Sequence, residues 1–287
     1  MNYQKGIIGA IPDQARHLFH DLKPGGDPGP ALQKLARFAA GNDMVCGLGY
    51  SLLQQLGIEV PGIHEMPQFK SAQQHIPANS HALWCWLRGK DRGALLHLCR
   101  EVNALLADSF EPVLNIDAFN YDGGRDLTGY EDGTENPEGQ AALETALVSC
   151  NDPNLDGGSF VAVQQWLHDL DAFGAMNKSQ QDNVIGRERI SNDEMDDAPP
   201  AAHVKRTAQE DFDPEAFVLR RSMPWSGDKG EGLVFVAFGR DFYAFEALLN
   251  NMLGNNDGIT DNLFQISKPL NGAYFWCPPV KDGLLLI

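Results

Sequence analysis

The stretch HALWCWLRGKDRGALLHLCREVNALLADS (residues 81–109) contains two different hydrophobic patterns in succession. Its first part, 81–89, is a short apolar and aromatic run, which is typical of a buried β-strand. Its second part, 91–109, repeats apolar residues at helical spacing with charged residues between them, which predicts an amphipathic helix. The stretch therefore predicts a strand and a helix joined by a charged turn.

The same order of patterns returns about 150 residues later in GLVFVAFGRDFYAFEALLNNMLG (232–254). A strongly apolar run again leads through a charged turn into an amphipathic helix, which ends at a glycine. Two copies of one unit predict an α+β fold built from two similar halves, each an antiparallel β-sheet with helices packed on one face. A polar stretch, NDPNLDGG, separates them, so we place the halves at residues 1–148 and 149–287.

The remaining apolar segments predict further elements in both halves. Periodicity and turn residues predict strands at 5–12, 44–51 and 158–170, and helices at 31–41, 51–57 and 171–186. The acidic, proline-containing stretch 191–202 predicts an exposed loop.

The composition limits the kind of protein that this chain forms. Hydrophobic residues make up 43% of the 287 residues and charged residues 21%, which is ordinary for a globular protein with a sizeable core. The net charge of −17 argues against a nucleic-acid partner, because phosphate binding depends on clustered Lys and Arg. No apolar run approaches the ~20 residues of a membrane span, so we expect no membrane partner. The N-terminus does not resemble a secretory signal, which predicts a cytoplasmic location.

Several common catalytic and metal-binding motifs are missing from the sequence. It contains no GxSxG, HExxH, Walker or GxGxxG motif, so the hydrolase and dinucleotide-binding classes lose their usual support. Asp152, Asn154 and Asp156 match the first half of an EF-hand calcium loop, but the twelfth position is Val163 instead of a bidentate Glu. A turn between the halves is the better interpretation of that segment.

Three other segments contain residues with possible chemical roles. The loop GYEDGTENP (129–137) has the glycines and proline of a tight turn, but turn formation does not require the carboxylate of Asp132. His203 follows the acidic loop, in a place where the chain could aim an imidazole into a cleft. VLRRSMPWSG (218–227) places Arg220 and Ser222 between the start of an apolar strand and a turn that ends at a proline. Taken singly, a turn, a structural histidine and a surface basic pair explain these segments at least as well.

Taken together, in this order and at these spacings, the segments resemble the Dyp-type (dye-decolourising) haem peroxidases over nearly the whole chain. The resemblance rests on the acid loop Gly129–Pro137 with Asp132 in it, on His203 in an H-x-x-R motif, and on the basic segment Leu219–Pro224. The segment VAVQQWLHDL (161–170) also looks like the family's. The compact length and the missing signal look most like the short bacterial, intracellular branch.

The resemblance implies two ferredoxin-like halves that enclose one haem b. Residues 1–148 would contain the distal acid loop, and residues 149–287 the proximal histidine and most of the haem contacts. His203 would be the iron ligand, with Asp261 as the acceptor of its other N–H, although Asp257 and Asp241 compete for that role. The resemblance further implies four haem contacts, from Gly133, Asn136, Arg206 and Arg220.

The resemblance also implies a peroxidase that reduces hydrogen peroxide and oxidises dyes, phenols or other organic donors through a ferryl intermediate. Asp132 would transfer the peroxide proton, and Arg220 would stabilise the developing hydroxide and keep Asp132 ionised. Ser222 would orient the water or the peroxide. Which of Asp132 and Arg220 dominates is left open, because members of the family differ. A homo-oligomer, a dimer or larger, is a further implication.

Two other classes of haem protein fit parts of the pattern. A chlorite dismutase-like protein has related halves, but that family lacks the G-x-x-D-G acid loop. A haem carrier, chaperone or iron-releasing protein on the same scaffold stays open as a non-peroxidase alternative.

Overall fold

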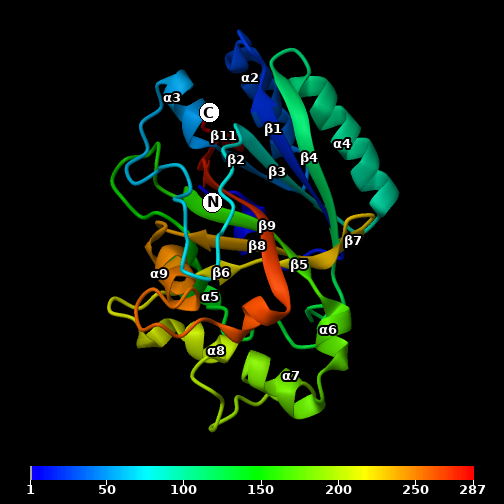
Figure 1. Ribbon diagram of the computed structural model, residues 1–287. Coiled ribbons are helices and arrows are strands. Elements are labelled where there is room, and N and C mark those ends of the chain that lie inside the picture. Colours follow the sequence, from blue (N-terminus) through cyan, green and yellow to red (C-terminus); the bar gives the residue numbers. More distant parts are fainter. Residues whose placement is uncertain (1) are drawn as a thin grey trace.

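The computed structural model describes residues 2–287 (Figure 1). The N-terminal part contains four antiparallel strands in the order β4-β1-β3-β2. Their bounds are β1 (Gln14–Leu22), β2 (Met44–Leu48), β3 (Leu83–Gly89) and β4 (Phe110–Phe119). Helices α2 (Pro28–Ala40) and α4 (Arg92–Leu106) pack against each other and against this sheet. Shorter helices lie in the connections: α1 (Lys5–Ile8), α3 (Tyr50–Leu56) and α5 (Gly139–Ala146).

The C-terminal part repeats this arrangement with the strand order β9-β5-β8-β7. Its strands are β5 (Ser159–His168), β6 (Leu219–Arg220), β7 (Met223–Gly227), β8 (Gly230–Gly239) and β9 (Ser267–Cys277). Between β5 and β6 lie α6 (Leu170–Ala175), α7 (Lys178–Ile185), α8 (His203–Arg206) and the 3-10 turn η1 (Gln209–Asp211). Helix α9 (Tyr243–Met252), the turn η2 (Asn262–Gln265) and the hairpin of β10 (Val280–Lys281) and β11 (Leu284–Leu285) complete the fold. The predicted α+β fold of two ferredoxin-like halves is confirmed.

Two contacts between strand edges join the two sheets into a ring. Leu48 of β2 pairs with Trp276 of β9, and Ala118 of β4 pairs with Trp225 of β7. Since β5 pairs with both β8 and β9, the hydrogen-bonded order runs around the molecule and returns to its start. The sequence predicts each sheet but not this closure. Hydrophobic periodicity indicates that a segment is a strand, but not which other strand its edge pairs with.

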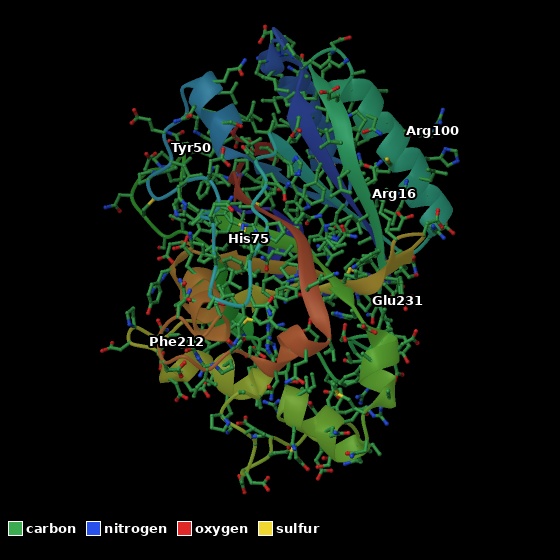
Figure 2. All side chains as sticks on the ribbon, viewed as in Figure 1. Arg16, Tyr50, His75, Arg100, Phe212 and Glu231 are labelled. Atoms are coloured by element: carbon green, nitrogen blue, oxygen red, sulfur yellow. The ribbon has the colours of Figure 1, made fainter. Side chains whose placement is uncertain are left out.

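Alternate residues of the strands point into two different cores. Leu83, Cys85 and Leu87 of β3 belong to the core under the helices, whereas the tryptophans between them point into the ring. This alternation fixes the register of a strand that has apolar residues on both faces. Figure 2 shows side chains filling the space between the sheets. The aromatic side chains that meet inside the ring, with neighbouring centroids 6.0–6.4 Å apart, are Trp84, Trp86, Phe238 and Phe275.

Residues 5–12 do not form the strand that the sequence predicts. The short helix α1 forms there, and the segment pairs with no neighbouring strand among the described residues. Instead, the carbonyl oxygen of Ile8 accepts a hydrogen bond from Arg221, and that of Ala10 accepts one from Arg88. Only Gly6 and Ile7 of this segment are buried, and arginine side chains bond to two of its carbonyl groups in place of a sheet.

The other predicted elements are confirmed, with ends that differ by a few residues. The predicted helix at 171–186 is divided into α6 and α7, because Asn177 forms a capping box with Gln180 and starts a new helix. Strands β1, β4, β7 and β9 and the hairpin of β10 and β11 were not predicted. Within residues 2–287 the structure contains no helix with the length and apolar character needed to cross a membrane. The division at 148/149 stays a prediction.

One histidine is buried among the aromatic side chains inside the ring. The His17 ring stacks on Trp84 and Trp86 at centroid distances of 5.9 and 6.0 Å, and its Nδ1 accepts a hydrogen bond from the Trp84 indole N–H (3.3 Å). No group among the described residues bonds to its Nε2. Burial lowers the pKa of His17 from 6.5 to about 3, because apolar surroundings disfavour the imidazolium.

We expect this histidine to make the fold sensitive to acid. Between pH 6.5 and about 3, the unfolded chain binds a proton at His17 that the folded chain does not bind, so stability falls as the pH falls. One such group lowers the free energy of unfolding by up to about 1.4 kcal/mol per pH unit. His17→Phe should retain the stacking and remove this contribution. Urea unfolding from about pH 7 to about pH 4 measures the slope, and equal slopes for the two proteins would contradict the expectation.

Candidate active site

A cavity lies in the C-terminal part, where β5 and β8 face α9. Its cavity volume is about 100 Å³, inside a larger empty space of about 730 Å³ that includes open solvent. The walls are mainly apolar, and the side chains responsible include Val218, Leu233, Phe235, Phe245, Leu249 and Met252. Asp132, His203 and Arg220, three of the predicted site residues, line the same cavity.

His203 is the first residue of α8 and is held by a buried carboxylate. Its Nδ1 lies 2.8 Å from Oδ2 of Asp261, whose side chain is fully buried. The second oxygen of Asp261 accepts the backbone N–H of Leu263 at 2.8 Å, which fixes the carboxylate at the start of η2. Because Nδ1–H donates to Asp261, the Nε2 of His203 keeps its lone pair for a ligand in the cavity.

The two rival carboxylates have other partners. Asp257 forms an ion pair with Arg206 (2.8 Å), and Asp241 accepts the backbone N–H of Tyr243 (3.0 Å). The guanidinium of Arg206 also donates to the carbonyl of Asn251, and its side chain is not among those that line the cavity. The structure therefore does not bring Arg206 to the site, although the sequence analysis assigned it a cofactor contact.

The acid loop begins after β4 and folds back on itself before it reaches the cavity. The backbone N–H of Gly129 donates to the backbone carbonyl of Asp126 (2.8 Å), and the backbone N–H of Asp132 donates to that of Gly124 (3.1 Å). Gly133 has a φ of +76°, which is in the left-handed region, and a Cβ there would lie 2.6 Å from the amide nitrogen of Asn136. The turn itself therefore requires this glycine. These contacts place the Asp132 carboxylate at the cavity.

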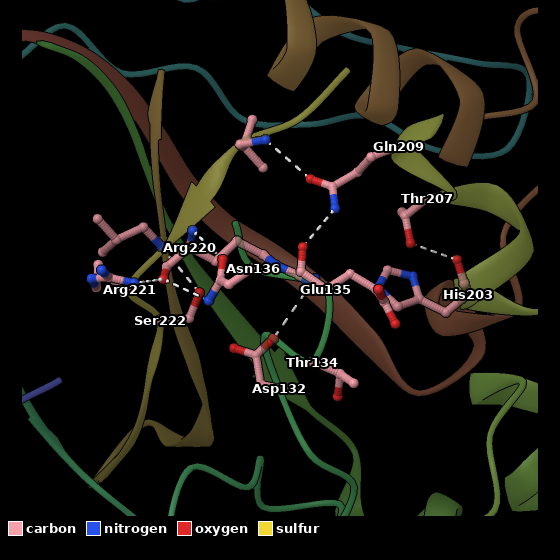
Figure 3. Close-up of polar contacts among 12 residues, drawn as sticks. Asp132, Thr134, Glu135, Asn136, His203, Thr207, Gln209, Arg220, Arg221 and Ser222 are labelled. Atoms are coloured by element: carbon pink, nitrogen blue, oxygen red, sulfur yellow. Dashed lines mark hydrogen bonds and ion pairs between the residues drawn. The ribbon is translucent and has the colours of Figure 1, made fainter. Parts of the chain in front are cut away.

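Asn136 connects this loop to β6. Its amide oxygen accepts the backbone N–H of Arg220 (2.8 Å), and its amide nitrogen donates to the carbonyl of the same residue (3.1 Å) (Figure 3). One amide side chain thus pairs with a strand residue as a neighbouring strand would. The pairing fixes the backbone from which the Arg220 side chain extends.

Asp132 and Arg220 face each other across the cavity edge. The Nη1 of Arg220 lies 3.9 Å from Oδ1 of Asp132, and about a fifth of each side chain is exposed (19% and 23%). The Nε of Arg220 is buried and has no partner among the described residues. The pair therefore offers a carboxylate and a free guanidinium N–H in one place.

Ser222 is close to this pair but outside the main cavity. Its hydroxyl accepts the backbone N–H of Val236 at 3.4 Å. Together with Asp132, Ser222 lines a separate void of about 10 Å³. A void of this size has room for about one water molecule.

A second, more open cavity adjoins the first and shares Asp132, His203 and Arg220 with it. Its rim is largely acidic, and the carboxylates of this rim belong to Glu131, Glu135, Glu194 and Glu210. Arg187 also lines it and forms an ion pair with Glu135 (2.6 Å). The exposed carboxylate of Glu135 therefore has a partner and is not simply solvated.

Sequence reasoning missed several polar residues of the cavity. Gln164, Trp166 and His168 lie on one face of β5 and line the cavity together with Ser267 of β9. Their spacing of two residues in a largely apolar strand was a usable signal. Gln209 was also missed. Its amide nitrogen donates to the carbonyl of Glu135, and its amide oxygen accepts the backbone N–H of Val218. Nothing in the sequence around Gln209 indicates that role.

Comparisons with known proteins agree with these observations. The family model described as "Dyp-type peroxidase, C-terminal" matches residues 123–282. A dye-decolorizing peroxidase of Rhodococcus erythropolis is 31% identical over 248 residues, which cover 84% of this chain and 73% of that protein. Another, from Mycolicibacterium paratuberculosis, is 31% identical over 224 residues; the match covers 76% of this chain and only 63% of that relative's length.

A solved structure gives the same result for the fold. A variant of DypB from Rhodococcus jostii, in complex with heme, superposes with a TM-score of 0.85 at 24% identity, covering 95% of this chain and 94% of that one. The family match begins at residue 123 and covers more than half of the chain. It includes the acid loop, His203 and Arg220. The chain belongs to the Dyp-type peroxidase family.

Proposed function

We propose that the protein is a haem b peroxidase that reduces hydrogen peroxide while oxidising dyes, phenols or other organic donors. One observation carries the proposal: a single cavity is lined by an imidazole that a buried carboxylate orients, and by an acid–guanidinium pair. The names of the relatives support the activity, and the heme of the DypB structure supports the cofactor.

The residues present fit a haem. His203 offers a free Nε2, and its hydrogen bond to Asp261 raises its basicity as a metal ligand. The apolar walls suit the faces of a porphyrin. A bound haem would supply the iron that takes up peroxide and holds its oxidising equivalents. Asn136 and Gly133 contribute by shaping the loop beside it.

Asp132 and Arg220 supply the proton transfer that peroxide cleavage requires. Peroxide is a weak acid, and a proton must move from one oxygen to the other before the O–O bond breaks heterolytically. Asp132 takes this proton and returns it to the far oxygen. Arg220, 3.9 Å from Asp132, stabilises the negative charge on the leaving oxygen. Ser222 would orient a water or the peroxide beside Asp132, next to the neighbouring void.

The acid–guanidinium pair also separates the peroxidase from the carrier alternative. A carrier or iron-releasing protein needs a ligand for the haem but no group for moving a proton at the cavity. No feature of the described residues favours that alternative. The homo-oligomer and the cytoplasmic location stay predictions, which light scattering and cell fractionation would test.

His203→Ala should abolish cofactor binding. Loss of the imidazole removes the iron ligand, while the apolar walls remain. We expect the Soret absorbance of protein purified with haem supplied to fall to the level of unbound haem. The matched control is His97→Ala, an exposed histidine of α4, which should retain full absorbance. Full Soret absorbance in His203→Ala would show that another residue binds the iron.

Arg220→Leu should slow the reaction with peroxide by about 10²–10³-fold, which is the effect of removing one charge-stabilising donor. Haem content should change much less, because the guanidinium is not the ligand. Stopped-flow absorbance after peroxide addition measures the rate, and a haem titration measures the content. Arg240→Leu is the control, since Arg240 is exposed and does not line the cavity. An unchanged rate in Arg220→Leu would remove this residue from the mechanism.

A further inference from the structure

Three buried side chains form a hydrogen-bonded chain that the peroxide chemistry does not use. The Oγ of Ser267 lies 2.7 Å from Nδ1 of His168, and the Nε2 of His168 lies 3.0 Å from Oδ1 of Asp126. Only 5% of the His168 side chain and 14% of the Asp126 side chain are exposed. The order hydroxyl, imidazole, carboxylate is the one in which the imidazole takes the hydroxyl proton in many enzymes.

The fold holds the three groups in place. His168 ends β5 and Ser267 begins β9, and the two residues are paired in the register of these strands. Asp126 lies in the loop that follows β4, where its other oxygen accepts the backbone N–H of Thr128 at 2.9 Å and the Thr128 hydroxyl at 2.6 Å. These hydrogen bonds therefore join β5, β9 and the segment after β4, and that last segment continues into the acid loop.

The surroundings fix the direction of the hydrogen bonds. The pKa of Asp126 is lowered: its burial acts to raise the pKa, and the hydrogen bonds from His168 and Thr128 outweigh that effect. Asp126 is thus an ionised acceptor, so the Nε2 of His168 donates to it and the Nδ1 accepts the Ser267 O–H. The Ser267 oxygen keeps lone pairs for another donor.

The Ser267 end of the hydrogen-bonded chain borders two spaces. His168 and Ser267 both line the main cavity and also an open groove on its other side. The groove has apolar side chains such as Phe264 next to charged ones such as Asp171 and Lys268. Because the main cavity is the proposed haem site, a small aromatic donor would bind in the groove, beside Ser267 and the base behind it.

Oxidation of a phenol or an aromatic amine requires such a base. Each donor molecule AH gives up one electron and one proton, and the balanced reaction is H₂O₂ + 2 AH → 2 H₂O + 2 A•. The electron reduces the oxidising equivalent that peroxide leaves in the site. The O–H or N–H proton needs an acceptor at the place where the donor binds, and Asp132 already serves the peroxide.

We propose that Ser267, His168 and Asp126 accept the proton that a phenolic or anilinic donor releases, an inference that rests on the proposed peroxidase function. The donor proton moves to the Ser267 oxygen as the Ser267 proton moves to Nδ1 of His168. The resulting imidazolium is paired with the Asp126 carboxylate. The proton then leaves through the groove to solvent, and the chain returns to its starting state.

The test compares a donor that releases a proton when it is oxidised with one that does not. 2-Methoxyphenol loses an electron and a proton, whereas ferrocyanide loses only an electron. His168→Gln can still donate to Asp126 and hold the loop, but it cannot take up a proton. We expect kcat/KM for 2-methoxyphenol, measured per bound haem, to fall about 10²-fold more than kcat/KM for ferrocyanide. Ser267→Ala, which removes only the hydroxyl, should behave in the same way.

The control for burial is His81→Gln. His81 is also a largely buried histidine, 2.9 Å from a carboxylate (Asp21), but it does not line the cavity or the groove. This variant should oxidise both donors at the unmodified rate. Equal losses with both donors in His168→Gln, or no loss with the phenol, would overturn the proposal. Equal losses would mean that the chain only positions the acid loop.

A second measurement needs no turnover. 4-Nitrophenol is hard to oxidise, and its anion absorbs visible light, so difference spectra report how much of the bound phenol is ionised. The unmodified holoprotein should lower the pH at which bound 4-nitrophenol ionises, and His168→Gln should abolish that shift. An unchanged shift in His168→Gln would overturn the proposal. If no donor is oxidised at all, the proposed function fails, and this titration still decides whether the three residues accept the proton.

Discussion

The pairing of the Asn136 amide with the backbone of Arg220 is the contact on which the site depends. The acid loop follows β4 of one sheet, whereas the cavity belongs to the other sheet. Two hydrogen bonds from one side chain bring them together and set the separation of Asp132 from the guanidinium. The closed ring of strands makes this possible, because it fixes the end of β4 beside β7.

Local patterns in the sequence predicted a large part of this arrangement. The change from strand period to helix period at 81–109 and at 232–254 predicted both copies of the repeated unit. The repeated unit could be predicted because it depends on neighbours close in the chain. Asp132, His203 and Arg220 were assigned to one site only through the resemblance to the Dyp-type peroxidases, and the structure places all three on one cavity.

Features that depend on long-range contacts could not be predicted. The resemblance named Asp261 as the partner of His203, but the residues alone left Asp257 and Asp241 open, and it is the fold that places Asp261 2.8 Å from the imidazole. Arg206 has the right spacing in H-x-x-R, but Asn251 and Asp257, which lie 45 and 51 residues away, bind its guanidinium. The apolar run 5–12 failed as a strand for the same reason, since distant arginines bond to its carbonyl groups.

The two carboxylates of the site differ in their contact with solvent. Asp261 is fully buried against His203, whereas nearly a quarter of the Asp132 side chain is exposed and its guanidinium partner is 3.9 Å away. Dissolved ions screen charges that water reaches and hardly affect those that it does not. The electron-donating strength of the imidazole should therefore be constant across ionic strength, while the balance between Asp132 and Arg220 should follow the salt content of the medium.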